Sequence, residues 1–90
     1  MARLTARDLE QLRFARQLSA SGEAFRIRRA SGFSQSELAD PTGVTPSCIS
    51  RWEAGERRPH GKAGARYGQL LRSLQEQEGG AGTESPSAAA

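Results

Sequence analysis

The stretch ADPTGVTPSCISRWEAGERRP, residues 39–59, decides the fold that we predict for this chain. Pro41 has no backbone N–H and cannot sit deep in a helix, so it marks the end of one helix. A second helix follows, with Thr45 as its N-cap and Pro46 in its first helical position. Gly55 then stops that helix. The stretch therefore predicts two short helices in close succession.

The turn between these two helices is short and contains Gly43 and Val44. Two helices joined by a turn of about three or four residues that includes glycine form a helix-turn-helix motif. The second helix of such a motif can lie in the major groove of DNA. The helix over about residues 45–54 is therefore a candidate for reading DNA.

Two capping boxes mark helix starts before this stretch, each a Ser or Thr followed three residues later by an acidic residue. Thr5 and Asp8 open the first helix, and Ser34 and Glu37 open the helix before the turn. A break is predicted near residues 19–22, where small residues and a glycine gather. The first predicted helix covers about residues 5–18, and the second begins at Ser21 or Gly22 and ends before Gly32. The third begins at about residue 34 and ends between residues 39 and 42, and the last two cover about residues 45–54 and 61–78.

The last predicted helix has apolar residues at helical spacing, although Gly64 and Gly68 are expected to weaken it. Beyond Glu78 the chain has no large apolar residue and is expected to be disordered. We therefore predict an all-α bundle of about five helices. Its expected divisions are an added N-terminal helix at 1–19, a helix-turn-helix domain at 20–75, and a flexible acidic tail rich in Gly, Ser and Ala at 76–90.

The composition favours a binding protein over an enzyme. Ninety residues leave little room for an enclosed active site, and no catalytic Cys/His or Ser/His/Asp spacing is present. The single cysteine, Cys48, and the single histidine, His60, allow neither an internal disulfide nor a structural zinc site made by this chain alone. We expect no metal, no cofactor and no small-molecule ligand.

The charge and the hydropathy indicate the partner and the compartment. A net charge of +3 with 13 basic residues favours a polyanionic partner, with a merely solvated basic surface as the alternative. No apolar run approaches the ~18 residues that span a membrane, and the N-terminus lacks the apolar core of a signal peptide. We expect a soluble, cytoplasmic protein.

The segment IRRASGFSQSELADPTGVTPSCISRWEAGERRP, residues 27–59, resembles the Cro/phage-repressor-like helix-turn-helix family, also called the XRE family. The resemblance lies in an arginine before a glycine, then Ser-Gln-x-x-Leu-Ala, Gly-Val-Thr, Ile-Ser, and Glu-x-Gly followed by a proline. The continuation resembles small regulators of high-GC bacteria and their phages. Pro41 and the added helix at residues 5–18 depart from the family pattern. The resemblance implies a lambda-repressor-like bundle that binds double-stranded DNA.

The expected DNA contacts come from the reading helix and from residues that flank it. Arg51 is able to make a bidentate contact with guanine, with phosphate contact as the rival role. Pro46 offers shape or contact with a thymine methyl, and the hydroxyls of Ser47 and Ser50 discriminate weakly between bases. Gln35, at a helix N-terminus, is placed to reach a phosphate, and the resemblance implies that it also steadies the reading helix. Arg57 and Arg58, at the C-terminal end of this helix, are expected to contact phosphates. The full set of predicted DNA-binding residues is Gln35, Thr45, Pro46, Ser47, Ser50, Arg51, Arg57 and Arg58.

Glu53 would repel phosphates if it faced DNA. The resemblance implies that it pairs instead with Arg28, as a structural ion pair that fixes helix packing. Ile49 and Trp52 are expected in the core, because their positions face back towards the other helices. Cys48 is expected to have no redox role.

The resemblance implies a transcriptional regulator, a phage-type Cro or repressor, that binds an operator with an inverted repeat. It would act in the cytoplasm, at the nucleoid, or in the host cytoplasm if phage-encoded. Two alternatives stay open: a recombination directionality (excision) factor, which tandem direct repeats would favour, and an antitoxin-type partner-binding protein. A homodimer is expected through the apolar residues of the added helix, which are Leu9, Leu12, Phe14 and Leu18. In the rival arrangement this helix folds back on its own domain.

Overall fold

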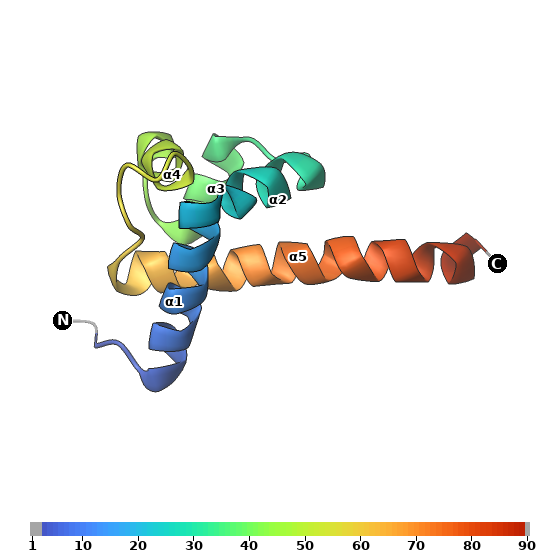
Figure 1. Cartoon of the computed structure of the whole chain (residues 1–90), viewed down its shortest axis with the longest axis horizontal. Helices are drawn as coiled ribbons and strands as arrows, with labels where there is room; N and C mark the ends of the chain where they lie inside the picture. The colour runs from blue at the N-terminus through green and yellow to red at the C-terminus, as the bar shows by residue number, and fades with distance from the viewer. Residues whose placement is uncertain (1–2, 90) are drawn as a thin grey trace.

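The computed structural model describes residues 3–89, and it describes side chains as far as residue 77. Within residues 3–89 the chain forms five α-helices and no strand (Figure 1). The helices are α1 (Ala6–Ser21), α2 (Glu23–Ser31), α3 (Gln35–Thr42), α4 (Pro46–Glu53) and α5 (Gly61–Ala89). The predicted all-α bundle of about five helices is therefore confirmed.

The predicted caps and the predicted break define the first three helices. The Thr5 hydroxyl accepts from the backbone N–H of Asp8 at 3.0 Å, and the Asp8 carboxylate accepts from the backbone N–H of Thr5 at 2.9 Å. Ser34 and Glu37 form the second capping box, with corresponding distances of 3.0 and 2.8 Å. Between α1 and α2, Gly22 has a φ of +85°, a left-handed conformation that glycine adopts without strain. Both boxes and the break are confirmed.

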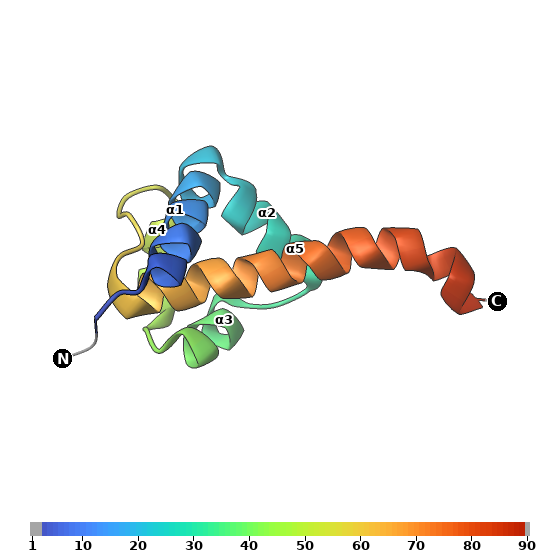
Figure 2. The ribbon, with the colours of Figure 1, turned by 90° about the horizontal axis from the view of Figure 1, so that it is seen from below.

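A single core joins the helices. Its largest side chains are Trp52 of α4 and Tyr67 of α5, whose ring centroids lie 4.9 Å apart. Ile27, Ile49 and Leu71 are also fully buried, so the predicted core positions of Ile49 and Trp52 are confirmed. Figure 2 shows α5 at the centre, with α1 and α2 on one side of it and α3 on the other.

The added helix, α1, crosses α5 and belongs to the same core (Figure 1). Leu12, Ala15 and Leu18 are buried, and Phe14 is half-buried with the guanidinium carbon of Arg72 4.2 Å from its ring centroid. The expectation that Leu12 and Leu18 are free to contact a second subunit is therefore wrong. The rival arrangement, in which this helix folds back on its own domain, is the one observed, because the core of so small a chain takes up these leucines.

Two glycines of α5 allow α1 to approach closely. A Cβ atom at Gly68 would lie 2.0 Å from the carbonyl oxygen of Gln11. A Cβ atom at Gly64 would lie 2.6 Å from Cδ1 of Leu12 and 2.9 Å from the carbonyl carbon of Pro59. These distances are far shorter than van der Waals contact, so α1 can sit where it does because both positions lack a side chain. The two glycines that the sequence indicates as weak points of this helix are therefore the positions on which α1 packs.

The C-terminal part of α5 extends beyond the other helices, and its ribbon continues to Ala89 (Figure 1). The tail that the sequence predicts to be disordered begins near residue 78. From residue 78 onward the side chains lie outside the described part of the structure, so the disorder of the tail stays a prediction.

Candidate nucleic-acid interface

The helix α4 has one buried side and one exposed side. Ile49 and Trp52 are buried against the core, and the Thr45 hydroxyl caps the helix by accepting from the backbone N–H of Cys48 at 3.2 Å. The predicted base-contacting residues lie away from the core: Thr45, Pro46, Ser47 and Arg51 are exposed, and Ser50 is half-buried. A polar, exposed side on a helix that is anchored from behind is the geometry needed to enter a DNA groove.

Glu53, the last residue of α4, is held by two side chains. Nε and Nη2 of Arg28 donate to its carboxylate at 2.5 and 3.0 Å, and Nε2 of Gln35 donates to it at 3.1 Å. The Arg28 and Glu53 side chains are only 8% and 3% exposed. The hydrogen bond to Glu53 raises the pKa of Arg28 against the opposing effect of burial. The carboxylate is therefore neutralised inside the domain and does not face solvent.

This ion pair, which the family resemblance implies, ties α2 to the end of α4. A further bond from Nη1 of Arg28 to the carbonyl of Phe33, at 2.8 Å, extends the tie to the connection between α2 and α3. Gln35 takes part from the first turn of α3 and is half-buried. In this structure its amide supports α4 through Glu53, which is one of the two roles expected for it. Its predicted contact with a phosphate stays a prediction.

The loop at residues 54–60 carries Arg57 and Arg58 from the end of α4 to the start of α5, and both arginines are exposed. The backbone N–H groups of Glu56 and Arg57 donate to the carbonyl oxygen of Arg51 at 3.0 and 3.3 Å. The loop is thus wound onto the last turn of α4. As a result, the two arginines expected on phosphates stay next to the C-terminal end of α4.

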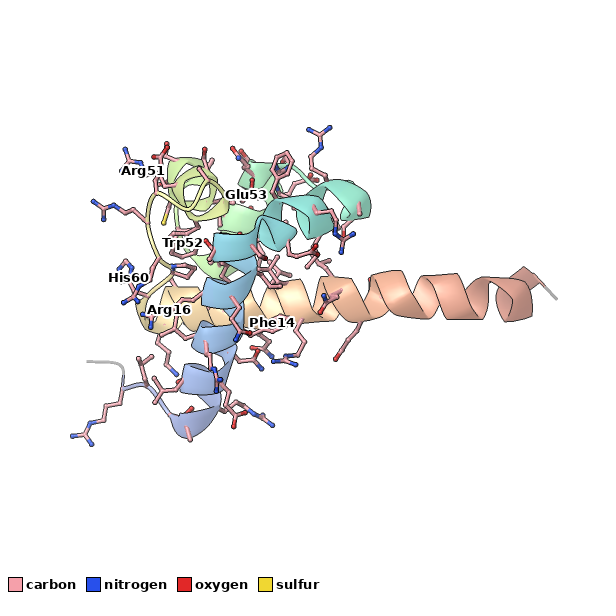
Figure 3. All side chains as sticks on the ribbon, in the orientation of Figure 1. Phe14, Arg16, Arg51, Trp52, Glu53 and His60 are labelled. Carbon is pink, nitrogen blue, oxygen red and sulfur yellow. The ribbon has the colours of Figure 1, made fainter. Side chains whose placement is uncertain are left out.

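Two residues of α1 bond to the backbone on either side of the exposed part of this loop, one at the end of α4 and one at Pro59, and sequence reasoning did not place them near the interface. Nε of Arg16 donates to the carbonyl oxygen of Pro59 at 2.8 Å. The hydroxyl of Ser19 donates to the carbonyl oxygen of Trp52. Figure 3 shows Arg16 on the side of the molecule where α4 and its loop lie. These partners are 43 and 33 residues apart, so no local pattern connects them.

A further polar contact ties α1 to the start of α5. Nζ of Lys62 lies 2.7 Å from the Asp8 carboxylate. The hydrogen bond from Lys62, together with the one from the backbone N–H of Thr5, lowers the pKa of Asp8 to about 2. The sequence identifies Asp8 only as part of a cap, because Lys62 is 54 residues further along the chain.

In the part of the chain that the structure describes, no group of three or more His, Cys, Asp or Glu side chains is placed to hold a metal ion. Cys48 is a free thiol and is half-buried in α4. None of the described helices is both long and apolar enough to cross a membrane.

The pair α3 and α4, the tight turn at residues 43–45 and the exposed side of α4 define a helix-turn-helix domain. Residues 25–66 match the model of a protein family described as Helix-turn-helix. The matched segment runs from α2 into α5, so it contains the interface described above but leaves out α1. This match supports the resemblance to the XRE family and supports DNA binding by this segment. No curated protein and no solved structure was found to match the chain.

Proposed function

We propose that this protein binds double-stranded DNA in a sequence-specific manner and regulates transcription, as a repressor of the Cro type. In this proposal α4 lies in the major groove. Its exposed side would contact base edges, and Arg51 would read a guanine through two parallel hydrogen bonds. Thr45, Pro46, Ser47 and Ser50 would fit the groove around that contact.

One observation carries the proposal. The charged residues of α4 are Arg51 and Glu53. Arg51 is exposed, whereas Glu53 is turned into the domain and neutralised by Arg28. The charge that α4 offers to a partner is therefore purely basic, as a helix close to phosphates requires.

Affinity would come mainly from phosphate contacts. Arg57 and Arg58 are exposed beside the C-terminal end of α4, where the DNA backbone would pass if that helix lay in the groove. Contacts of this kind position a protein on DNA without reading sequence, and they release bound counterions. Binding should therefore weaken as the salt concentration rises.

The test is a DNA-binding measurement at several salt concentrations, on duplexes selected by the wild-type protein from a random library. Changing Arg57 and Arg58 together to Ala should weaken binding to all sequences and lower the salt slope by about two. Arg7 and Arg13, exposed residues of α1, provide a control that removes the same charge elsewhere and should change the slope much less. Failure of the wild-type protein to select any sequence over random DNA would refute the proposed function.

We further propose that the protein acts as a homodimer on an inverted repeat whose half-sites are about 34–36 Å apart. With α1 packed on its own domain, Leu4 and Leu9 are the exposed leucines near this helix, at 38% and 54% exposure. Sedimentation of the protein with and without the selected duplex tests this point. Two chains on one inverted repeat would support the dimer, and one chain on a single half-site would contradict it. Selection of tandem direct repeats would instead favour an excision factor.

A further inference from the structure

We infer that Arg16 and Ser19 of α1 are positioning residues for DNA binding. They hold the loop at residues 54–60 so that Arg57 and Arg58 stay beside α4. This inference rests on the proposed function, and it assigns a role in that function to a helix outside the matched segment at residues 25–66.

The two contacts bracket the loop. Ser19 donates to the carbonyl of Trp52, just before the loop begins, and Arg16 donates to the carbonyl of Pro59, just before it ends. Pro59 is fully buried, whereas residues 54–58 between the two anchors are exposed. Both anchors use backbone carbonyls, so they fix the course of the main chain and leave the arginine side chains of the loop free for a partner.

The helix α1, which supplies both donors, is held at its first turn and packs closely on α5. Its first turn is closed by a capping box and by the ion pair between Asp8 and Lys62, 2.7 Å apart. Its middle rests on Gly64 and Gly68, where even a methyl group would collide with α1. Gly64 also touches the buried end of the loop, since a Cβ atom there would lie 2.9 Å from the carbonyl carbon of Pro59. The first turns of α5, α1 and the end of the loop therefore meet at one packed junction.

Fixing the loop matters because an irregular exposed segment opens easily and must be ordered when it binds. If the loop is already ordered in the free protein, less entropy is lost when Arg57 and Arg58 contact phosphates. Loss of the Arg16 contact should therefore weaken binding through its effect on the loop.

The experiment compares Arg16→Met with Arg13→Met. Both variants remove one positive charge from α1, but Arg13 is exposed and Arg16 is bonded to the loop. Arg16→Met should weaken binding to the selected duplex about fivefold and lower the salt slope, whereas Arg13→Met should do neither to the same extent. Arg16→Lys keeps a donor and the charge and should restore part of the affinity. Thermal melting establishes that each variant is folded, and Ser19→Ala tests the other anchor.

A direct contact between Arg16 and a phosphate would also lower affinity, and a double-mutant cycle separates the two explanations. In a chain that already carries Arg57→Ala and Arg58→Ala, the change Arg16→Met should have almost no further effect. A full additional loss in that background would mean that Arg16 contacts DNA itself, and it would overturn the positioning role.

Amide hydrogen exchange of the free protein gives a readout that does not depend on DNA. The backbone N–H groups of Gly55, Glu56 and Arg57, which bond to Trp52 and Arg51, should exchange faster in Arg16→Met. Those of α3 should not change. Equal exchange in Arg16→Met and Arg13→Met, with equal affinities, would overturn the inference. A wild-type protein that binds no DNA would overturn the proposed function, whereas the exchange rates would still show whether Arg16 holds the loop.

Discussion

Arg28 and Glu53 lie 25 residues apart in sequence and meet through two hydrogen bonds, of 2.5 and 3.0 Å, behind the exposed side of α4. Their side chains are almost entirely shielded from water. A buried ion pair adds little net stability compared with a well-packed apolar pair, but removal of one partner leaves an uncompensated charge. The main role of the pair is therefore to fix the position of α4 relative to α2.

Glu53→Gln should destabilise the protein by about 3 kcal/mol, because the guanidinium of Arg28 would stay buried without a counter-ion. Urea denaturation at neutral pH measures the change in the free energy of unfolding. Glu56→Gln, on the exposed loop, is the matched control and should stay within about 0.5 kcal/mol of the wild type. Similar small effects of both substitutions would contradict the claim that the Arg28–Glu53 pair holds α4 in place.

Arg51→Ala should relax discrimination at one base pair of the selected DNA by about 1–3 kcal/mol, because a bidentate contact with guanine is lost. Competition binding with single-base variants of that DNA measures the change. The combined change of Arg57 and Arg58 to Ala should weaken all these variants equally and provides the comparison. If Arg51→Ala also weakens all of them equally, Arg51 contacts a phosphate and does not read a base.

Gly68→Ala should destabilise the protein by about 1–3 kcal/mol, the usual cost of overpacking, although alanine is the better helix former. The reason is that the new methyl group would lie 2.0 Å from the carbonyl oxygen of Gln11 and would push α1 off α5. Thermal or urea denaturation tests this prediction. Ser73→Ala, at an exposed position of the same helix, should be neutral or slightly stabilising. A neutral Gly68→Ala would mean that α1 does not rest on this glycine.

Asp8→Asn should lower the melting temperature at pH 7 but have little effect near pH 2. The pKa of Asp8 in the folded protein is about 2, below the ~3.9 expected for an unfolded chain. The ionised carboxylate therefore adds stability that is present above about pH 4 and is lost as the pH falls through 2. Melting curves over this range, with Asp40→Asn on the exposed part of α3 as the control, measure the effect. A difference from the wild type that is the same at both pH values would contradict the ion pair with Lys62.

Truncation after residue 78 should change the melting temperature little, because the removed segment has no large apolar residue to offset the entropy of ordering it. Truncation after residue 70 is the control and should lower stability strongly, since it removes Leu71 and Leu74 from the core. A drop of several degrees in the melting temperature on truncation after residue 78 would show that the tail packs on the domain.

Much of the fold follows from rules that act over three or four residues. The capping boxes at Thr5 and Ser34, the N-cap at Thr45 and the break between the first two helices lie where the sequence predicts them. These signals are reliable because a helix end must satisfy its own N–H and C=O groups with residues close by in the chain. The three-residue spacing of Ile49 and Trp52 is also a local signal, because it places both side chains on the same, buried side of α4.

The family resemblance adds a pair that spacing alone does not reveal, Arg28 with Glu53. It does not reach α1, which the matched segment omits. From the sequence, the leucines of this helix could serve either a second subunit or the chain's own core, since an apolar stripe does not specify its partner.

Only the packing of the helices settles where α1 lies and what it holds. In the sequence, Gly68 is only a residue of low helix propensity. In the structure, the carbonyl oxygen of Gln11 occupies the place where a side chain at this position would be. The bonds from Arg16 to Pro59, from Ser19 to Trp52 and from Lys62 to Asp8 join residues 33 to 54 positions apart. Such contacts depend on the angle and distance at which two helices cross, and the packing of the whole core sets both quantities. Caps, turns and helical periods, in contrast, are properties of residues that are neighbours in the sequence.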